Sequence, residues 1–298
     1  MAKGTKELKQ RITGVKNIQQ ITSAMEMVAT QKLKRLQGRA DAVRPFSTKI
    51  QEMVGRLAGS VSRDLSPLLG ERDVKTTTNL VITSDKGMCG GYNSNLVRFA
   101  MGVLKDSAAE GTEQKLHVLG RKGDILLRAR GFTLDKKYDD VVEKLDFTRV
   151  RGLARELVND FLEGRTDRLR LVYTTFITPA RQRPVAVTIL PIDPAELIAA
   201  EEGDEPVADA KQDLGFIVEP DDETLLKDLL PKFLEIKVYS AILESLASEF
   251  TARRNAMKQA TDAADDMISA LTRQYNRARQ ESITSELLEV SSGAEALK

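Results

Sequence analysis

A glycine-rich loop, SDKGMCGGYN at residues 84–93, is the part of this sequence that comes nearest to a site for chemistry. It follows a short β-rich run at residues 79–84 and precedes a helical stretch, which is where phosphate-binding loops lie. The loop lacks the Gly-Lys-Ser/Thr ending that places a lysine and a magnesium-binding hydroxyl, and it is not a GxGxxG motif. The pattern favours a tight strand-to-helix turn, and a nucleotide site stays open as the alternative.

The reactive side chains around this loop are few. Cys89 and His117 are the only cysteine and histidine, so a Cys–His nucleophile would need these two to meet in the fold. A packing role is favoured for both, and Asp85 beside Lys86 fits a turn cap better than an acid–base pair. No two carboxylates occur in a context typical of glycosidases or metal sites. The sequence therefore predicts no catalytic residue, no metal and no cofactor.

The composition favours long exposed helices over a compact enzyme. Charged residues make up 30% of the 298 residues, there is no tryptophan, and only five are tyrosine. The net charge of +1 argues neither for nor against nucleic acid, but residues 1–40 hold nine Lys or Arg against two acids. These basic residues lack interleaved aromatics, but from them alone a solvated helix face and a nucleic-acid surface stay open. The motif at residues 276–296, described below, shifts the balance, and no nucleic-acid partner is expected.

The N-terminal segment predicts one long helix from about residue 4 to residue 58. Apolar residues recur every three or four positions and form a narrow stripe close to coiled-coil spacing. We expect Pro45 to kink the helix, although the apolar period continues beyond it. A mitochondrial transit peptide is disfavoured because the pattern runs past residue 40 without a cleavage-like site. The residues assigned to the stripe are Ile12, Val15, Ile18, Ile21, Met25, Val28, Leu33 and Leu36.

The middle of the chain alternates strands with helices. Strands are predicted at residues 79–84, 116–119, 169–177, 184–190 and 215–218, and helices at 94–108 and 148–163. This alternation predicts a small, mostly parallel, Rossmann-like sheet with helices on its faces. Residues 199–213, with six acids against one lysine, are expected to form a solvated loop.

The C-terminal segment predicts a second long helix from about residue 222 to residue 290. Its first part is rich in leucine, and its later seam is rich in alanine, which lets a partner helix approach closely. No apolar run reaches the roughly 20 residues of a membrane-spanning helix. The predicted fold class is α/β. It has a long antiparallel two-helix coiled coil (residues 1–60 and 221–298) and an α/β domain (residues 75–220). A two-helix coil covers one stripe on each helix, so its other faces are expected to contact other proteins.

Three motifs resemble the gamma subunit of F-type ATP synthases. They are ITSAMEMVATQKLKR at residues 21–35, the loop at residues 84–93, and NRARQESITSELLEVSSGAEA at residues 276–296. They occur in the family's order and cover nearly the whole chain. The resemblance implies a non-catalytic rotor stalk. Its partners would be the alpha and beta subunits of the catalytic ring, the epsilon subunit and the ring of c subunits, and ATP chemistry would take place in beta.

The resemblance also implies contact residues. Arg279 and Gln280 match an Arg-Gln pair that reaches a beta loop. Arg253 matches a basic position near an acidic helix of beta, with Arg254 as a competing choice, and Met25 matches a methionine facing the same region. With Cys89 alone, the chain cannot form the paired-cysteine redox switch of some photosynthetic members.

The resemblance implies a peripheral position on the cytoplasmic face of a bacterial inner membrane. The alternative is the matrix or stroma side in a eukaryotic organelle. Two other classes of function remain: a nucleotide-binding enzyme built on the central sheet, and a coiled-coil scaffold or nucleic-acid binder.

Overall fold

Two long helices, three shorter helices and a five-stranded sheet make up most of the described residues. The computed structural model describes residues 3–60, 66–70, 72–109, 111–139, 141, 145–179, 181–193 and 221–295. Helix α1 spans Lys3–Ser60 and helix α6 spans Asp222–Glu295, which confirms the two predicted long helices. The chain divides into two compact units: residues 1–31 with 252–298, and residues 32–251. Each long helix contributes to both units.

The sheet of the larger unit has the strand order β3-β2-β1-β4-β5. The strands are β1 (Thr76–Ile82), β2 (Glu113–Leu119), β3 (Lys136–Tyr138), β4 (Arg168–Thr178) and β5 (Arg181–Leu190). Neighbours among β1 to β4 pair in parallel, and β5 pairs antiparallel with β4. The predicted mostly parallel sheet is therefore confirmed. Strand β3, with the sequence KKY, was missed because three residues carry no recognisable alternation.

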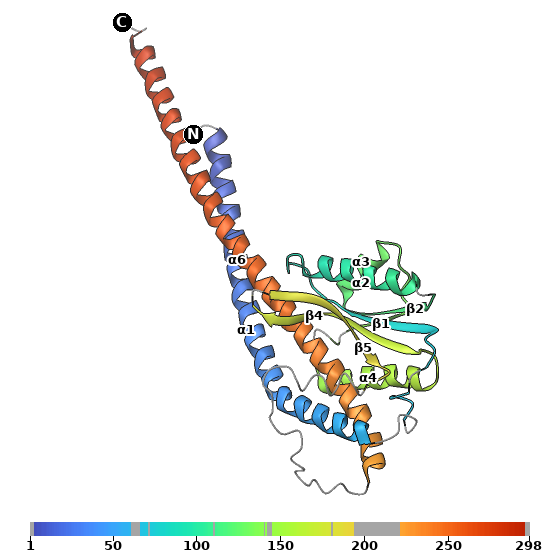
Figure 1. Ribbon diagram of the computed structural model, residues 1–298. Coiled ribbons are helices and arrows are strands. Elements are labelled where there is room, and N and C mark those ends of the chain that lie inside the picture. The colour runs from blue at the N-terminus through green and yellow to red at the C-terminus, as the bar shows by residue number, and fades with distance from the viewer. Residues whose placement is uncertain are drawn as a thin grey trace. The chain divides into compact units, whose positions relative to one another are not determined.

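Helices cover both faces of the sheet (Figure 1). On one face, α2 (Tyr92–Ala109) and α3 (Arg121–Arg128) enclose a core that includes Val81 and Val172 of the sheet. On the other face, α4 (Phe147–Leu162) and part of α6 bury the opposite side chains of the same strands, such as Leu80 and Leu171. Successive side chains along each strand point to opposite faces of the sheet, so each strand contributes to two separate cores.

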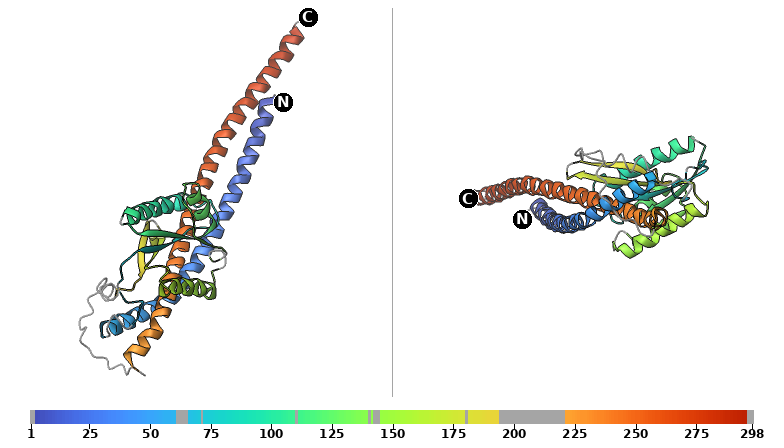
Figure 2. Two further views of the ribbon diagram at one scale, coloured as in Figure 1. Left: turned by 90° about the vertical axis from the view of Figure 1, so that its right-hand side faces the viewer. Right: turned by 60° about the horizontal axis from the view of Figure 1, so that its bottom comes forward.

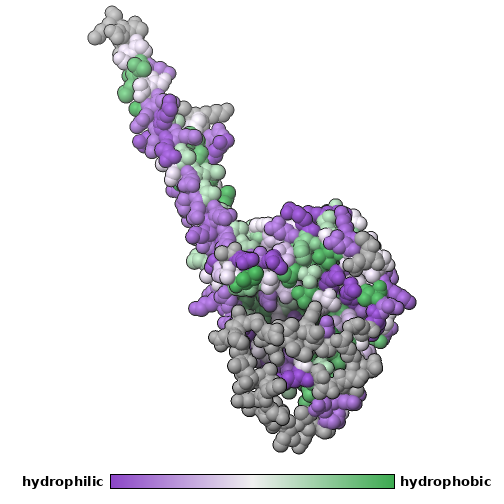
Figure 3. Space-filling view, viewed as in Figure 1, coloured by the Kyte–Doolittle hydropathy of each residue, from purple (hydrophilic) through white to green (hydrophobic). Residues whose placement is uncertain are grey.

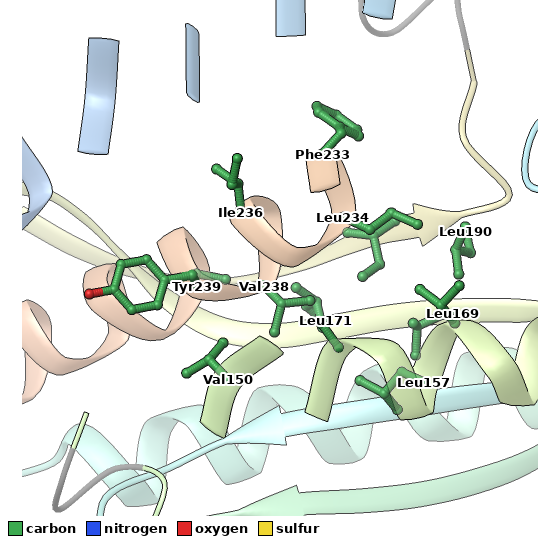
Figure 4. Close-up of a cluster of buried hydrophobic side chains, with 14 of the residues drawn as sticks. Val150, Leu157, Leu169, Leu171, Leu190, Phe233, Leu234, Ile236, Val238 and Tyr239 are labelled. Atoms are coloured by element: carbon green, nitrogen blue, oxygen red, sulfur yellow. The ribbon is translucent and has the colours of Figure 1, made fainter. Parts of the chain in front are cut away.

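The first part of α6 is a core helix of this larger unit. Its apolar side chains are buried against α4, β4 and β5 (Figure 4). Tyr239 also packs edge to face on Phe147, with ring centroids 5.3 Å apart. The side chains of α6 drawn in this core are Phe233, Leu234, Ile236, Val238 and Tyr239.

Helix α1 continues through Pro45, although proline removes one backbone hydrogen bond. Figure 1 shows the helix turning sharply in its second half, as the predicted kink requires. Two other expectations, the acidic loop at residues 199–213 and a strand at residues 215–218, lie outside the described residues.

Candidate partner-binding surface

Helices α1 and α6 pair in opposite directions in the smaller unit. Figures 1 and 2 show them side by side. The hydroxyl oxygens of Thr22 and Thr261 lie 2.8 Å apart, and the Gln19 amide donates a hydrogen bond of 2.5 Å to Asp265. Because a higher residue number on α1 meets a lower one on α6, the pairing is antiparallel. The predicted coiled coil is confirmed.

The seam between the two helices follows a heptad spacing on each. The inward residues are buried or half-buried and recur in steps of three and four, as positions a and d of a coiled coil do. On α1 they are Thr5, Leu8, Ile12, Val15, Gln19, Thr22, Glu26 and Ala29, and on α6 they are Met257, Thr261, Ala264, Ile268, Leu271, Tyr275, Ala278 and Ser282.

The sequence placed four residues in this seam wrongly, and one of them, Met25, is half-buried beside it. Ile18, Ile21 and Val28 are 55%, 56% and 53% exposed. Gln19 and Thr22 take the inward positions instead, because Asp265 and Thr261 offer them hydrogen bonds across the seam. A heptad count extended from Ile12 and Val15, with polar residues allowed at inward positions, finds this register.

The displaced residues form a second apolar stripe on α1. Ile18, Ile21, Met25 and Val28 recur at the same three- and four-residue steps, on the g and c positions when Thr22 is d. In an antiparallel pair, the g positions of the two helices flank the same side of the seam. On α6 that side carries Met267, which is 53% exposed. We call this side of the smaller unit the apolar flank; Figure 3 shows hydrophobic residues among hydrophilic ones along these helices.

Met25 and Arg253 both occupy g positions of the apolar flank, and both side chains are half-buried. Counted from the Thr22–Thr261 contact, they lie three and eight residues away in the same direction. At 1.5 Å per residue, they are about 8 Å apart along the axis. The structure therefore brings these two predicted contact residues close together. The competing Arg254 is also half-buried and donates to Asn255 at 3.4 Å.

Arg279 and Gln280 lie elsewhere on the smaller unit. Both side chains are exposed, at positions e and f of the heptad. Counted from Thr261 they are displaced by about 27 Å along α6, away from Met25. The four predicted residues thus form two groups at two levels of the coiled coil, not one site.

The glycine loop is held by a buried asparagine. Asn93 accepts a hydrogen bond from the backbone N–H of Ser84 and donates to the hydroxyl of Ser84, at 3.1 and 2.7 Å. Cys89, which is 2% exposed, lies 3.2 Å from the same Asn93 amide nitrogen. Met88 and Gly90 have positive φ angles of 61° and 56°. These contacts form a compact strand-to-helix turn, which agrees with the turn interpretation.

Asp85 caps the N-terminus of α3, a helix that begins 36 positions later in the chain. Its carboxylate accepts a hydrogen bond of 3.0 Å from the backbone N–H of Arg121, the first residue of α3. The residue before the helix, Gly120, offers no side chain for this purpose. The partner of Asp85 is therefore the start of a different element, and a negative charge there is favourable for the helix dipole.

His117 is a buried residue of β2, 5% exposed, and its Nδ1 lies 3.3 Å from the hydroxyl of Tyr138. That hydroxyl donates to Glu156 of α4 at 2.7 Å. Burial lowers the pKa of His117 below its ordinary 6.5, and the nearby acids Asp160, Asp135 and Glu156 oppose this shift in part. The chain of contacts ties the sheet to α4.

None of the described helices has an apolar stretch long enough to cross a membrane. Among the described residues, no three His, Cys, Asp or Glu side chains gather as metal ligands would.

Comparisons with known proteins point to one family. A family model described as ATP synthase matches residues 4–297. An ATP synthase gamma chain from Moorella thermoacetica is 41% identical over 295 residues, covering 98% of this chain and 99% of its own length. A gamma chain from Nitratidesulfovibrio vulgaris is also 41% identical, with 98% of each chain covered.

Solved structures agree in fold. A chain from the central stalk and c-ring of the Tetrahymena thermophila mitochondrial ATP synthase is 26% identical, with a TM-score of 0.57 and coverage of 80% of this chain and 99% of that one. A chain from an Euglena gracilis mitochondrial ATP synthase structure is 19% identical, with a TM-score of 0.67 over 99% of this chain and 94% of that one. The second likeness concerns the fold alone.

Proposed function

Because the chain belongs to the ATP synthase family, we propose that it is the central rotor stalk of a proton-translocating F-type ATP synthase. In this role it turns with the c-subunit ring and drives each beta subunit through its catalytic states in sequence. The alpha and beta subunits surround the coiled coil, and epsilon and the c ring contact the α/β domain. The chain itself is not catalytic, and it lies peripherally on the cytoplasmic face of a bacterial membrane, or on the equivalent side in an organelle.

The apolar flank is the observation that supports this proposal best. Ile18, Ile21 and Val28 are each more than half exposed, and the seam with α6 is already complete without them. Burying the exposed half of one such side chain against another protein is worth about 0.8–1.5 kcal/mol. A stripe of this kind on a coiled coil indicates a protein partner on that side.

The predicted contact residues fit the same proposal. Met25 and Arg253 share the apolar flank at neighbouring levels, so one beta element can meet both. Arg279 and Gln280, on a different side and further along α6, would meet a different loop. We retain residues 1–60, 75–220 and 221–298 as the proposed functional segments of stalk, foot and stalk.

The physics restricts how torque is transmitted. An exposed ion pair is worth about 0–1 kcal/mol, and a turning stalk must break and remake each contact. We therefore propose that the shape and stiffness of the coiled coil carry most of the torque, while Arg279 and Gln280 tune the positions at which the stalk pauses.

Co-purification tests the function. A tagged chain is co-expressed with the alpha and beta subunits of its own complex, and we expect all three to elute together with ATPase activity. The tagged chain eluting alone would refute the proposal. Nucleotide bound by the isolated chain would support the enzyme alternative, and a DNA shift with a steep salt dependence would support nucleic-acid binding.

A further inference from the structure

Helix α6 occupies the place where sheets of this topology usually bind a ligand. The parallel strands β2, β1 and β4 end at one edge, and the chain order reverses between β1 and β4. In doubly wound folds, the crevice at such a reversal holds the ligand. Here α6 donates hydrogen bonds to both of these strands.

Two hydrogen bonds connect α6 to the two strands at this point, and a third contact connects it to the start of α2. The hydroxyl of Ser245 donates a hydrogen bond of 3.2 Å to the carbonyl oxygen of Ile82, the last residue of β1. One turn later, the hydroxyl of Ser248 donates at 3.2 Å to the carbonyl oxygen of Thr174 in β4. Tyr92, the first residue of α2, places its hydroxyl 2.7 Å from the hydroxyl of Ser245 and 3.1 Å from its carbonyl oxygen.

The direction of each hydrogen bond follows from which group has a proton to donate. Because the Ser245 hydroxyl gives its proton to Ile82, its oxygen accepts from Tyr92. Burial raises the pKa of the Tyr92 phenol far above its ordinary value, and the carboxylate of Glu249 adds to the rise. The phenol therefore remains a donor at any physiological pH. Ser245 and Ser248 are 1% and 0% exposed, so water does not compete for these bonds.

These polar contacts differ in kind from the packing around them. Apolar packing is not directional, so leucine and isoleucine contacts resist rotation of a helix about its axis only through shape. A hydrogen bond weakens steeply when its angle departs from linear. Two buried hydrogen bonds to backbone carbonyls of the sheet, and a third with Tyr92 of α2, therefore fix which face of α6 is turned toward the strands.

We propose that Tyr92, Ser245 and Ser248 form a torsional clamp that transmits torque between the α/β domain and α6. The inference rests on the proposed rotor function and adds positioning residues to it. Helix α6 is unbroken from Asp222 to Glu295, so a rotation imposed at the clamp is carried along one continuous helix. Without the clamp, α6 slips against the sheet under load, and hydrolysis continues with less ion transport per ATP.

A matched pair of substitutions at Ser245 tests the clamp. Ser245→Thr keeps the hydroxyl, and Ser245→Val has the same shape without it, so any crowding in this buried site affects both alike. The complete membrane-bound complex is assayed in inverted vesicles for ATP hydrolysis and for proton pumping. We expect both variants to hydrolyse ATP, and the Val variant to pump at least twofold fewer protons per ATP than the Thr variant.

Equal pumping per ATP by the two variants would overturn the clamp. If neither assembles, Tyr92→Phe decides, with Tyr239→Phe as the control because it removes the hydroxyl of a buried tyrosine on α6 outside the clamp. A pumping loss for Tyr92→Phe alone supports the clamp, whereas equal effects, or failure of Tyr92→Phe to assemble, refute it. Failure of the unmodified chain to co-purify with alpha and beta would instead refute the rotor function itself.

Discussion

Thr22 of α1 and Thr261 of α6, 239 positions apart in sequence, place their hydroxyl oxygens 2.8 Å from each other inside the seam of the coiled coil. Each hydroxyl also lies within hydrogen-bond distance of a carbonyl oxygen of its own helix, that of Gln19 or Met257. One hydroxyl donates its proton across the seam, while the other donates to the carbonyl oxygen of its own helix. The layer thus satisfies its polar groups and fixes the register of the two helices.

Replacing both threonines by valine is expected to change stability little. Replacing both partners of a buried hydrogen bond by apolar groups of the same shape is close to neutral or stabilising. We expect Thr22→Val with Thr261→Val to alter the free energy of unfolding of the coiled coil by less than about 1 kcal/mol. Denaturant titration followed by circular dichroism measures this. A loss several times larger would mean that the hydroxyls do more than set the register.

Proline at Ala264 is expected to uncouple the rotor. Ala264 is 6% exposed in the seam, and proline there removes a helical hydrogen bond and clashes with the preceding turn, at a cost of about 3 kcal/mol or more. We expect ion transport per ATP to fall more than in any single charge removal. Ala264→Gly, which keeps the backbone N–H and costs about 1 kcal/mol, is the matched control. Near-normal coupling in the proline variant would contradict the role of stiffness.

Removal of the Arg279 side chain is expected to have a modest effect. An exposed ionic contact contributes about 0–1 kcal/mol, and 1.36 kcal/mol corresponds to a tenfold change in rate. We therefore expect Arg279→Ala to change turnover by less than about fivefold, with altered pauses in single-molecule rotation. If this variant assembles normally but loses coupling altogether, the steric account of torque is wrong.

A polar residue on the apolar flank is expected to weaken assembly but not folding. Ile21 is 56% exposed, so Ile21→Ser should change the unfolding free energy of the isolated chain by about 0.5 kcal/mol or less. Because about half of this side chain is already covered, its contact with a partner is worth about 0.8–1.7 kcal/mol, so affinity for the alpha–beta ring should fall about fourfold or more. Gln20→Ser, at an exposed neighbour outside the stripe, serves as the comparison and should assemble normally.

Acid is expected to destabilise the α/β domain through His117. Its pKa in the folded chain lies below 6.5 because burial disfavours the charged ring. The unfolded chain therefore binds the proton more readily, and stability is lost as pH falls below about 6.5 until the folded pKa is passed. The difference in unfolding free energy between the wild type and His117→Gln, measured from pH 8 to pH 5, should show this loss. A difference that is constant with pH would show that the pKa of His117 is the same in the folded and unfolded chain.

Much of the fold could be predicted from local pattern. Steps of three and four between apolar residues identified both long helices, because such spacing places them on one face whatever the partner is. Alternating strands and helices identified the sheet and its mostly parallel order. The three-residue β3 could not be found, because its strand conformation depends on pairing with β2 and three residues are too few to show a strand pattern in the sequence.

The sequence by itself determined that α1 carries apolar residues at helical spacing, and that Met25, Arg253, Arg279 and Gln280 lie on long helices. The tertiary structure decided which of two stripes faces α6. Ile18 and Ile21 are more hydrophobic than Gln19 and Thr22, but α6 places Asp265 and Thr261 where they form hydrogen bonds with the two polar residues. The tertiary structure likewise decided the contact of Tyr92 with Ser245, 153 positions away. A hydrogen bond depends on where two groups meet in space, and that position is set by the packing of the whole domain, not by the neighbours of either residue in the chain.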